Sequence, residues 1–541
     1  MEKLGAQQFK EMLKSGYANL ANNAAYINTL NVFPVPDGDT GSNMSMTFEN
    51  GYKDAQKCIS DSISEVAKAL SRGLLMGARG NSGVITSQIF RGFYQSIEDK
   101  NDISVADVAA AFDNGAAVAY KAIMKPVEGT ILTVIRESSW YAKHDLETVN
   151  PDMDMEEYFR RFVQYASESL DRTPDLLPVL KEVGVVDSGG MGLLKILEGF
   201  SAYVEGRPVE LSAKTENAEQ SAVLEVENDE FGYCTEFILR LSSDYLHIFD
   251  EGKLKKKLSD LGDSLVVVKD DDLVKVHVHT LHPGDALNIG QRYGEFIKLK
   301  IENMQEQHSH LIEEKEAPKA HQKYGLIAVA SGEGLTKLFK DLRTDVVIAG
   351  GQTMNPSTED FIKKIEELGH CDHIFLFPNN SNIILAATQA KDVLKDRDIT
   401  VIPTKTIPEG LSAIGMFNFE GEPEDNVRDL ADVIANVHSG SVTYAIKDTT
   451  FDSVRVKEGD YISMYGKTIV SSGTSRFDVV CRLLDRIFAE GDRELLTMIV
   501  GEDRDEEEIM KIEEYIAENS DLELETIQGD QPVYAYLFGA E

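Results

Sequence analysis

The periodicity of the apolar residues changes twice along this chain of 541 residues. Residues 1–205 are rich in helix formers, and their apolar residues recur at helical spacing. Three such stretches are Ile63–Leu75, Val105–Ile123 and Tyr158–Leu170. Residues 231–311 mix strand and helix patterns, whereas residues 323–541 alternate short apolar runs with helical segments. Because the chain exceeds what one hydrophobic core usually serves, these blocks predict separate domains.

The expected fold class is therefore multidomain, with an all-α N-terminal domain, an α+β middle domain and an α/β C-terminal domain. Polar stretches at 206–230 and 312–322 predict the linkers between these domains. In the middle block, three segments have the apolar pattern of strands: Phe237–Leu241, Leu265–Val268 and Leu273–His279.

In the C-terminal block, continuous apolar runs predict a parallel sheet that helices cover on both faces. The runs begin at Gly325, Asp345, His373 and Ile399. Ligands of such sheets bind beyond the carboxyl ends of the strands. Polar loops follow those ends, beginning at Ser331, Gly350, Asn379 and Thr404. The acidic stretch 502–525 contains the helix-patterned run Ile509–Ile516, which predicts a solvated helix face rather than a binding tail.

The negative charge of the chain argues against two classes of binding partner. The chain has 54 basic and 92 acidic residues and a net charge of −38, which argues against nucleic acid or an anionic membrane as a partner. A polyanion such as ATP would then have to meet local positive features or metal ions. No run of 18 apolar residues and no secretory signal occur, and the four cysteines form no CxxC pair. We therefore expect a cytoplasmic protein without a transmembrane segment or a disulfide framework.

The segment Asn31–Asn43 is the first motif that can carry chemistry. Two prolines hold its entry extended, and Gly38 allows a tight turn, so Asp37 and Asp39 can direct their carboxylates to one point. Paired carboxylates suit Mg²⁺, which takes its remaining ligands from water and phosphates. Thr40, Ser42 and Asn43 are suitable N-caps for a helix expected over Met44–Tyr52, whose N-terminal amides would favour a phosphate. The alternative is an Asx-turn that leads into a capped helix without a ligand.

Three further turns combine Gly with small polar side chains. The segment Met76–Val84 contains Arg79, Asn81, Ser82 and Gly83 and has no Walker A pattern. Val127–Thr130 contains Gly129 and Thr130, and Val185–Gly192 contains Asp187 and Gly189. Each turn alone fits an ordinary helix–helix connection or a capped helix start. Several such turns in one helical domain nevertheless indicate a shared ligand, whose phosphates their amides would bind.

The middle block contains a candidate zinc site. His277 and His279 lie on the same face of the expected strand, and Cys234 is a plausible third ligand from a neighbouring strand. Three protein ligands would leave an open position, as in catalytic zinc sites, which places His279 among the catalytic candidates. The alternative is a histidine-bearing strand face and a structural cysteine.

The segments Asn31–Asn43, Gly77–Gly83 and Asp187–Gly190 together resemble the ATP-binding domain of the DhaL (DAK2) family of dihydroxyacetone kinases. The similarity continues in order through all three blocks, so the whole chain resembles the ATP-binding subunits of bacterial fatty acid kinases. The resemblance implies a helical barrel as the N-terminal domain, with Mg·ATP at one end. It also implies a DegV-like C-terminal domain, related to fatty-acid-binding proteins.

Several site residues follow from the resemblance alone. It implies that Asp37 and Asp39 bind magnesium, and Asn31 is the nearest counterpart of a further aspartate of the family. The implied nucleotide contacts are Thr40, Ser42, Asn43, Asn81, Ser82, Gly83, Gly129, Thr130, Asp187 and Gly189. Arg79 would steady the transferred phosphoryl group. The family's zinc ligands would match Cys234, His277 and His279.

The implied reaction is ATP-dependent phosphorylation of a fatty acid carboxylate that a separate acyl-binding protein of DegV type presents. The expected cofactors are ATP, Mg²⁺ and Zn²⁺. Two alternatives stay open: a kinase for a small ketose or polyol, and a non-catalytic scaffold or regulator that binds nucleotide and zinc. Whether the protein forms a homodimer is also left open.

Overall fold

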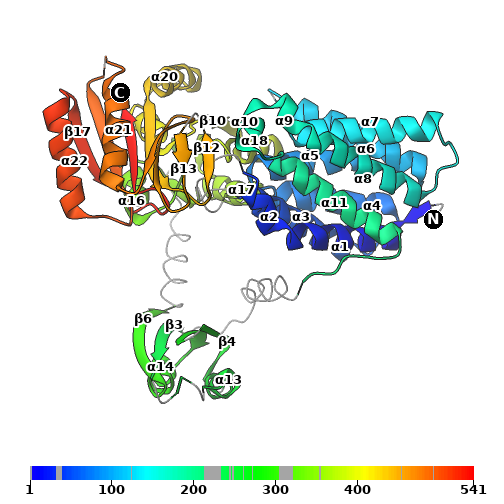
Figure 1. Ribbon diagram of the computed structural model, residues 1–541, viewed down its shortest axis with the longest axis horizontal. Helices are drawn as coiled ribbons and strands as arrows, with labels where there is room; N and C mark the ends of the chain where they lie inside the picture. Colours follow the sequence, from blue (N-terminus) through cyan, green and yellow to red (C-terminus); the bar gives the residue numbers. More distant parts are fainter. Residues whose placement is uncertain are drawn as a thin grey trace. The chain divides into compact units, whose positions relative to one another are not determined.

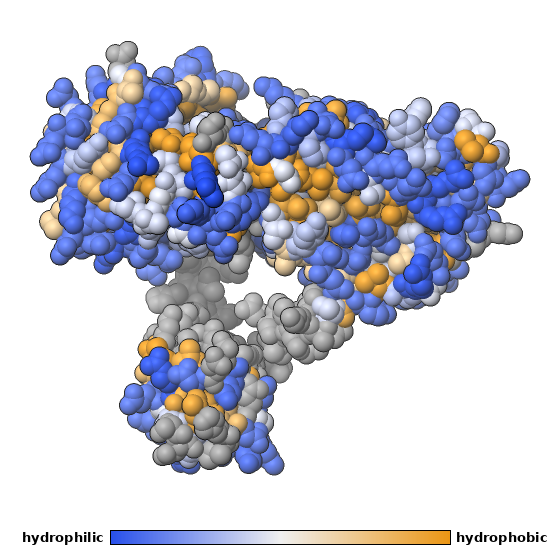
Figure 2. Space-filling model, viewed as in Figure 1, coloured by the Kyte–Doolittle hydropathy of each residue, from blue (hydrophilic) through white to orange (hydrophobic). Residues whose placement is uncertain are grey.

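The computed structural model describes residues 3–31, 39–123, 125–212, 233–242, 245–246, 249–259, 261–270, 272–303, 321–351, 355–451, 454–491 and 493–541. The chain forms two compact units: residues 1–211 together with 321–541, and residues 212–320 (Figure 1). The first unit thus contains both the expected helical domain and the expected C-terminal domain. Hydrophilic side chains cover much of the visible surface of this larger unit (Figure 2).

The N-terminal part of the larger unit is helical, as expected. Its helices are α1 (Ala6–Asn22), α2 (Ala24–Thr29), α3 (Thr40–Lys57), α4 (Ile63–Met76), α5 (Gly80–Ser96), α6 (Val105–Ala122), α7 (Ile131–Thr148), α8 (Met155–Asp171), α9 (Thr173–Leu176), α10 (Pro178–Val183) and α11 (Ser188–Val204). The short strands β1 (Lys3–Gly5) and β2 (Asp102–Ser104) pair antiparallel. Helices α4, α6 and α8 confirm the three stretches whose periodicity predicted helices. The closed barrel that the resemblance implies stays a prediction.

Aromatic rings fill the core of the helical domain. Phe90 lies 5.5 Å from Phe48 and 6.3 Å from Phe200 between ring centroids, so rings from α3, α5 and α11 meet in one cluster. Glycines allow α1 and α11 to approach closely, because a Cβ on Gly199 would lie 2.5 Å from the carbonyl oxygen of Ser15. This packing holds the long helices in fixed register.

The first sheet of the C-terminal domain is parallel, as predicted, with strand order β10-β9-β7-β8. Its strands are β7 (Gln322–Ala330), β8 (Val346–Ala349), β9 (Cys371–Phe377) and β10 (Asp398–Val401). The helices of this region are α16 (Glu333–Asp341), α17 (Thr358–Glu367), α18 (Ile384–Val393), α19 (Ile407–Gly415) and α20 (Pro423–Asn436). The apolar runs therefore located all of these strands.

The C-terminal domain also contains a second, larger sheet that the sequence analysis did not predict. Its strand order is β15-β14-β11-β18-β16-β17, and only β16 and β17 pair parallel. The strands are β11 (His438–Tyr444), β14 (Tyr461–Tyr465), β15 (Thr468–Gly473), β16 (Leu495–Val500), β17 (Glu523–Gln528) and β18 (Tyr536–Ala540), with a separate hairpin of β12 (Thr449–Phe451) and β13 (Val454–Val456). Helices α21 (Arg476–Phe488) and α22 (Glu506–Asn519) accompany them, and α22 confirms the helix predicted at Ile509–Ile516.

The smaller unit contains an antiparallel sheet with strand order β4-β5-β3-β6. The strands are β3 (Tyr233–Leu241), β4 (Gly262–Asp270), β5 (Leu273–Thr280) and β6 (Gly294–Asn303), and the helices are α13 (Glu251–Leu258) and α14 (Pro283–Gln291). Val274, Val276 and Val278 of β5 are buried in the apolar core of this unit. Strands β3, β4 and β5 cover the three segments with an apolar strand pattern.

The helical and C-terminal domains share an apolar cluster within the larger unit. Ala78, in the turn between α4 and α5, and Val84 of α5 are buried together with Ile327, Val329 and Ile362 of the C-terminal domain. The turn that the sequence analysis singled out is thus part of a domain contact.

Among the described residues, no helix combines the length and the apolar character that crossing a membrane requires.

Candidate functional site

Four helices begin at the same end of the helical domain. The hydroxyl oxygen of Ser188, the first residue of α11, lies 3.2 Å from the hydroxyl oxygen of Thr40, the first residue of α3. The backbone N–H of Ile131, at the start of α7, donates to the Asp187 carboxylate. A Cβ on Gly80, at the start of α5, would lie 2.7 Å from the side-chain nitrogen of Asn43. Because helix N-termini carry partial positive charge, this arrangement favours an anion. The four turns predicted to share a ligand therefore lie together.

Asn31 connects two of these helix starts. Its Oδ1 accepts hydrogen bonds from Thr40 Oγ1 at 2.8 Å and Ser188 Oγ at 3.3 Å. These bonds use the amide oxygen that a magnesium ion would otherwise take from Asn31. The structure thus shows Asn31 in a positioning contact, and its role as a metal ligand stays a prediction.

The expected N-caps of α3 were wrong. The helix begins at Thr40, with Asp39 at the N-cap position, so Thr40, Ser42 and Asn43 lie inside the first turn. Asn28, which the sequence analysis missed, accepts hydrogen bonds at Oδ1 from the backbone N–H groups of Gly41 and Ser42 at 2.8 and 3.3 Å. This distant side chain satisfies the helix start, so no local cap is needed.

Asp187 is the N-cap of α11, where its Oδ2 accepts from the backbone N–H of Gly190 at 2.7 Å. Burial by the surrounding protein raises the pKa of its carboxyl to about 6, although hydrogen bonds from Gly190 and Ile131 oppose this rise. A Cβ on Gly189 would lie 3.3 Å from both Asp187 Oδ2 and Ile131 Cβ. Asp187 therefore ties α7 to α11, and a direct nucleotide contact stays a prediction.

Gly129 and Thr130 form the start of α7. Gly129 has a positive φ of 81°, which L side chains rarely adopt. Thr130 is the N-cap, and its Oγ1 accepts from the backbone N–H of Leu132 at 3.4 Å and donates to the Val127 carbonyl. The structure confirms the turn that opens a helix here.

The turn before α5 packs tightly on α3. The backbone N–H of Arg79 donates to Thr47 Oγ1 at 3.1 Å, and a Cβ on Gly83 would lie 2.4 Å from the same oxygen. Thr47 is fully buried and was not predicted as a site residue. Ser82 lies in the first turn of α5, and Asn81 donates weakly to Asn382 Oδ1 at 3.5 Å. The start of α5 thus packs against Thr47 in the middle of α3, and Asn81 lies near Asn382 of the C-terminal domain.

The predicted magnesium ligands are only partly described. Asp37 lies outside the described residues, whereas Asp39 precedes α3 directly and its Oδ2 accepts a hydrogen bond from Asn355 of the C-terminal domain. A carboxylate oxygen beside a helix N-terminus is a suitable ligand for Mg²⁺, which would take further ligands from a bound phosphate. No group of three or more His, Cys, Asp or Glu side chains that could hold a metal ion occurs among the described residues.

The backbone register of the smaller unit brings the predicted zinc ligands together. Cys234 of β3 is paired with His279 of β5, and His277 lies two positions before His279 on the same strand. The side chains of these residues lie outside the described part of the structure, so the zinc site stays a prediction.

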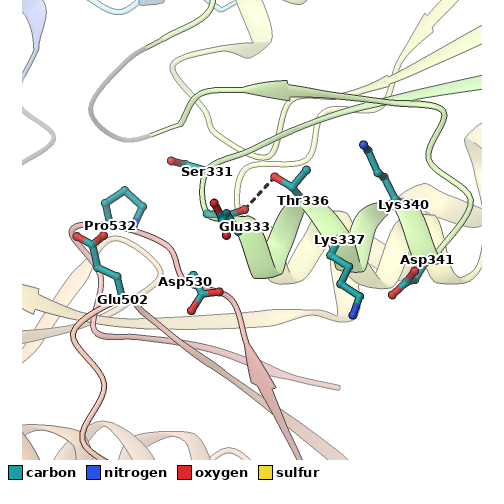
Figure 3. Close-up of a pocket in the computed structure, with 10 residues that line it drawn as sticks. Ser331, Glu333, Thr336, Lys337, Lys340, Asp341, Glu502, Asp530 and Pro532 are labelled. Carbon is teal, nitrogen blue, oxygen red and sulfur yellow. Dashed lines mark hydrogen bonds between the residues drawn. The ribbon is translucent and has the colours of Figure 1, made fainter. Parts of the chain in front are cut away.

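The strand ends of the parallel sheet border two hollows. One, of about 880 Å³, is lined by residues along the length of α16 and from two loops, including Glu333, Asp341, Glu502 and Asp530 (Figure 3). The other, beside Val329 and Asn379, has a volume of only about 10 Å³. Asn379 is buried and binds the Val329 carbonyl and Thr404, so it connects the strand ends. Drug-sized ligands need about 300 Å³ or more, so this inner hollow cannot hold an acyl chain.

Models of three protein families match the chain in order. Residues 34–202 match the DAK2 domain, residues 230–311 the middle domain of FakA-like fatty acid kinase proteins, and residues 325–541 the C-terminal domain of the same proteins. Protein YloV of Bacillus subtilis is 44% identical, and the alignment covers 99% of each chain. An uncharacterized protein of Staphylococcus epidermidis is also 44% identical, over 100% of each chain.

Two solved structures show only weak likeness. A DegV family protein of Corynebacterium glutamicum has 15% identity and a TM-score of 0.32, and the match covers 40% of this chain and 96% of that one. The dihydroxyacetone kinase of C. freundii in complex with AMP-PNP and Mg²⁺ has 20% identity and a TM-score of 0.28, covering 36% of this chain and 33% of that one. At these TM-scores neither likeness supports a functional assignment.

Replacing Asp187 by Asn should flatten the pH dependence of stability. Because the folded-state pKa of about 6 exceeds the ordinary value of 3.8, this carboxyl stabilises the fold below pH 4. That contribution, on the order of 2 kcal/mol, is lost as the pH rises through 6. Urea unfolding of Asp187→Asn between pH 4 and 7 should therefore show a smaller loss than wild type. Asp154→Asn, at the exposed N-cap of α8, is the matched control and should behave like wild type.

Proposed function

Because the chain belongs to the FakA-like family of fatty acid kinase proteins, we propose that it is the ATP-binding subunit of a fatty acid kinase. It transfers the γ-phosphoryl group of ATP to a fatty acid carboxylate and releases acyl phosphate and ADP. A separate acyl-binding protein presents the fatty acid.

The convergence of four helix N-termini is the observation that carries the nucleotide part of this proposal. The net charge of the chain is −38, so its average field repels ATP. The starts of α3, α5, α7 and α11 concentrate partial positive charge at one place, where they offer backbone N–H groups to phosphate oxygens. Phosphoryl transfer requires mainly such positioning and charge neutralisation.

The residues at this place have distinct proposed roles. Asp37 and Asp39 would hold magnesium, which neutralises charge on the phosphates when it is bound. Asn31 fixes Thr40 and Ser188 through its amide oxygen and is a further candidate ligand. The remaining contacts to nucleotide would come from the small side chains and amides of Thr40, Ser42, Asn43, Asn81, Ser82, Gly83, Gly129, Thr130, Asp187 and Gly189. Arg79 would steady the transferred group.

The acceptor needs little help from a base. A fatty acid carboxylate is ionised near pH 7 and is itself the nucleophile. Its oxygen forms a bond to the γ-phosphorus while the bond to the bridging oxygen breaks, and ADP leaves with that electron pair. Of the two hollows at the strand ends of the C-terminal domain, the inner one is too small for an acyl chain and the larger one is lined mostly by charged side chains, which agrees with a fatty acid that arrives on another protein.

We also propose a zinc ion in the middle domain. The register that pairs Cys234 with His279 and places His277 two positions away supports the ligand set of one cysteine and two histidines. An open position on this ion would put His279 close to reacting groups. A structural role of the same ion is the alternative.

Two other functions compete with the proposal. A ketose or polyol kinase would use the same nucleotide site with a soluble acceptor. A nucleotide- and zinc-binding scaffold would bind ATP without turnover. The family models of the middle and C-terminal domains favour the fatty acid kinase over both.

Asp39→Asn should weaken the binding of Mg·AMP-PNP by at least about tenfold, since a neutral amide is a poorer magnesium ligand than a carboxylate. Calorimetric titration with and without magnesium measures this change. Asp54→Asn, an exposed carboxylate on the same helix paired with Lys57, is the control and should bind like wild type. Full magnesium-dependent affinity in Asp39→Asn would disprove the metal assignment.

ADP release should require both a fatty acid and an acyl-binding partner. Omitting either should reduce the rate to background in a coupled ADP assay. Turnover with dihydroxyacetone or glycerol alone would instead establish the polyol kinase. Nucleotide binding without turnover in any mixture, tested across several acyl-binding proteins and chain lengths, would favour the scaffold.

Replacing His277 and His279 together by Ala should remove zinc from the purified protein. Elemental analysis of wild type should give about one zinc per chain, because one cysteine and two histidines form a single site. His282→Ala, just beyond β5, is the control and should keep the metal. A double variant that retained full zinc content would place the ion elsewhere.

A further inference from the structure

A loop of the C-terminal domain reaches the proposed nucleotide site. Asn355, which precedes α17, is 1% exposed and donates from Nδ2 to Asp39 Oδ2 at 2.5 Å. Its backbone carbonyl accepts from Arg79 Nη1 at 2.7 Å. One C-terminal residue therefore engages both a predicted magnesium ligand and the predicted phosphate-binding arginine.

The start of α17 completes this contact. Arg79 and Ser357 form a β-bridge, and the backbone N–H of Thr358 donates to the Ala78 carbonyl at 3.2 Å. The carboxylate of Asp360 lies 3.6 Å from Arg79 Nη1. The guanidinium charge of Arg79 is thus partly neutralised by the C-terminal domain.

Two further contacts hold the domains together away from Asp39 and Arg79. Lys447, between β11 and β12, donates to the backbone oxygens of Thr29 and Asn31 at 2.9 and 2.5 Å. Val179 and Val183 of α10 pack against an apolar cluster that contains Phe451 and Val456 of the hairpin. The C-terminal domain therefore contacts the helical domain at Thr29 and Asn31 and at α10 as well as at Asp39 and Arg79.

These contacts compete with the chemistry proposed for the site. Arg79 cannot direct the same N–H groups to a phosphate and to Asn355, and the Asp360 carboxylate would repel a phosphate that approached the guanidinium. The Asn355 amide donates to Oδ2 of Asp39, one of the two oxygens that this carboxylate would offer to a cation. The docked arrangement is therefore suited to the nucleotide-free protein.

The docked contact also has an energetic weakness. Arg79 Nε and Asn355 Oδ1 are buried and have no hydrogen-bond partner among the described residues. A buried polar atom without a hydrogen-bond partner loses its hydration and gains no bond in return, which destabilises the docked contact. A ligand that separated Arg79 and Asn355 would let both buried atoms form hydrogen bonds. Binding of such a ligand would therefore favour the separated state of the two domains.

We propose that docking of the C-terminal domain through Asn355 and Asp360 and binding of Mg·ATP exclude each other, so that nucleotide binding releases the C-terminal domain from the helical domain. This inference rests on the proposed nucleotide site. By linkage, a change that weakens docking must strengthen nucleotide binding, and the factor by which docking weakens is the upper limit of that gain.

Two variants weaken docking at separate places, and both leave the proposed nucleotide residues intact. Asp360→Asn removes the charge beside Arg79, and Glu359→Gln is its control, because Glu359 makes an exposed pair with Lys363 on the same helix. Val183→Asp places a charge in the contact of α10 with the hairpin. Val149→Asp is its control, because Val149 is 63% exposed.

Calorimetry with Mg·AMP-PNP on the full chain should show at least about fivefold tighter binding for Asp360→Asn and for Val183→Asp, at the lower end of usual coupling factors. Both controls should bind like wild type. In wild type, Mg·AMP-PNP should also accelerate amide hydrogen exchange in residues 357–360, because the Thr358 amide is bonded to Ala78 only in the docked state.

Unchanged or weaker binding by both variants, or slower exchange at 357–360 on addition of nucleotide, would overturn the inference while leaving the nucleotide site in place. Absence of Mg·AMP-PNP binding in wild type and in both variants would overturn the proposed function, and the inference with it.

Discussion

The common direction of four helices is the constraint on which the rest of the candidate site depends. The field of a helix terminus acts over about one turn, so the starts of α3, α5, α7 and α11 work together only if they lie within a few ångströms of one another. Asn31 joins α3 to α11, and Asp187 joins α7 to α11. Gly83 lets α5 approach Thr47 of α3. Short side chains at these positions are therefore a packing requirement as well as a chemical one.

The sequence predicted those parts of the fold that local patterns determine. Continuous apolar runs located the four strands of the parallel sheet, because strands buried on both faces leave no polar positions. The second sheet was missed although β16 (Leu-Leu-Thr-Met-Ile-Val) and β18 (Tyr-Leu-Phe-Gly-Ala) are buried apolar runs. Other strands of this sheet lack that signal. Strand β17, for example, reads Glu-Leu-Glu-Thr-Ile-Gln and is half exposed at a sheet edge. Its pairing partner supplies the stability that its own sequence does not reveal.

Local sequence patterns also failed to predict some single residues of the candidate site. Gly- and Thr-containing turns revealed where helices begin, since these residue types act on their own backbone. Asn28 and Thr47 act on chain segments 13 and 32 residues away, so no local pattern marks them. The wrong N-caps of α3 have this cause: once Asn28 satisfies the amides of Gly41 and Ser42, the helix can begin at Thr40 without a local cap.

The strand ends of the parallel sheet in the C-terminal domain contact the helical domain. Open α/β sheets bind ligands beyond the carboxyl ends of their strands. Here Asn379 and Thr404 close the inner part of that edge with hydrogen bonds. The loop that follows β8 at the same edge instead carries Asn355 to Asp39 of the helical domain. Part of the strand-end edge thus contacts another part of the chain, and Asn355 makes that contact through hydrogen bonds to Asp39 and Arg79. The polar loops that would receive a ligand in other open α/β sheets can therefore serve here as a contact between two domains.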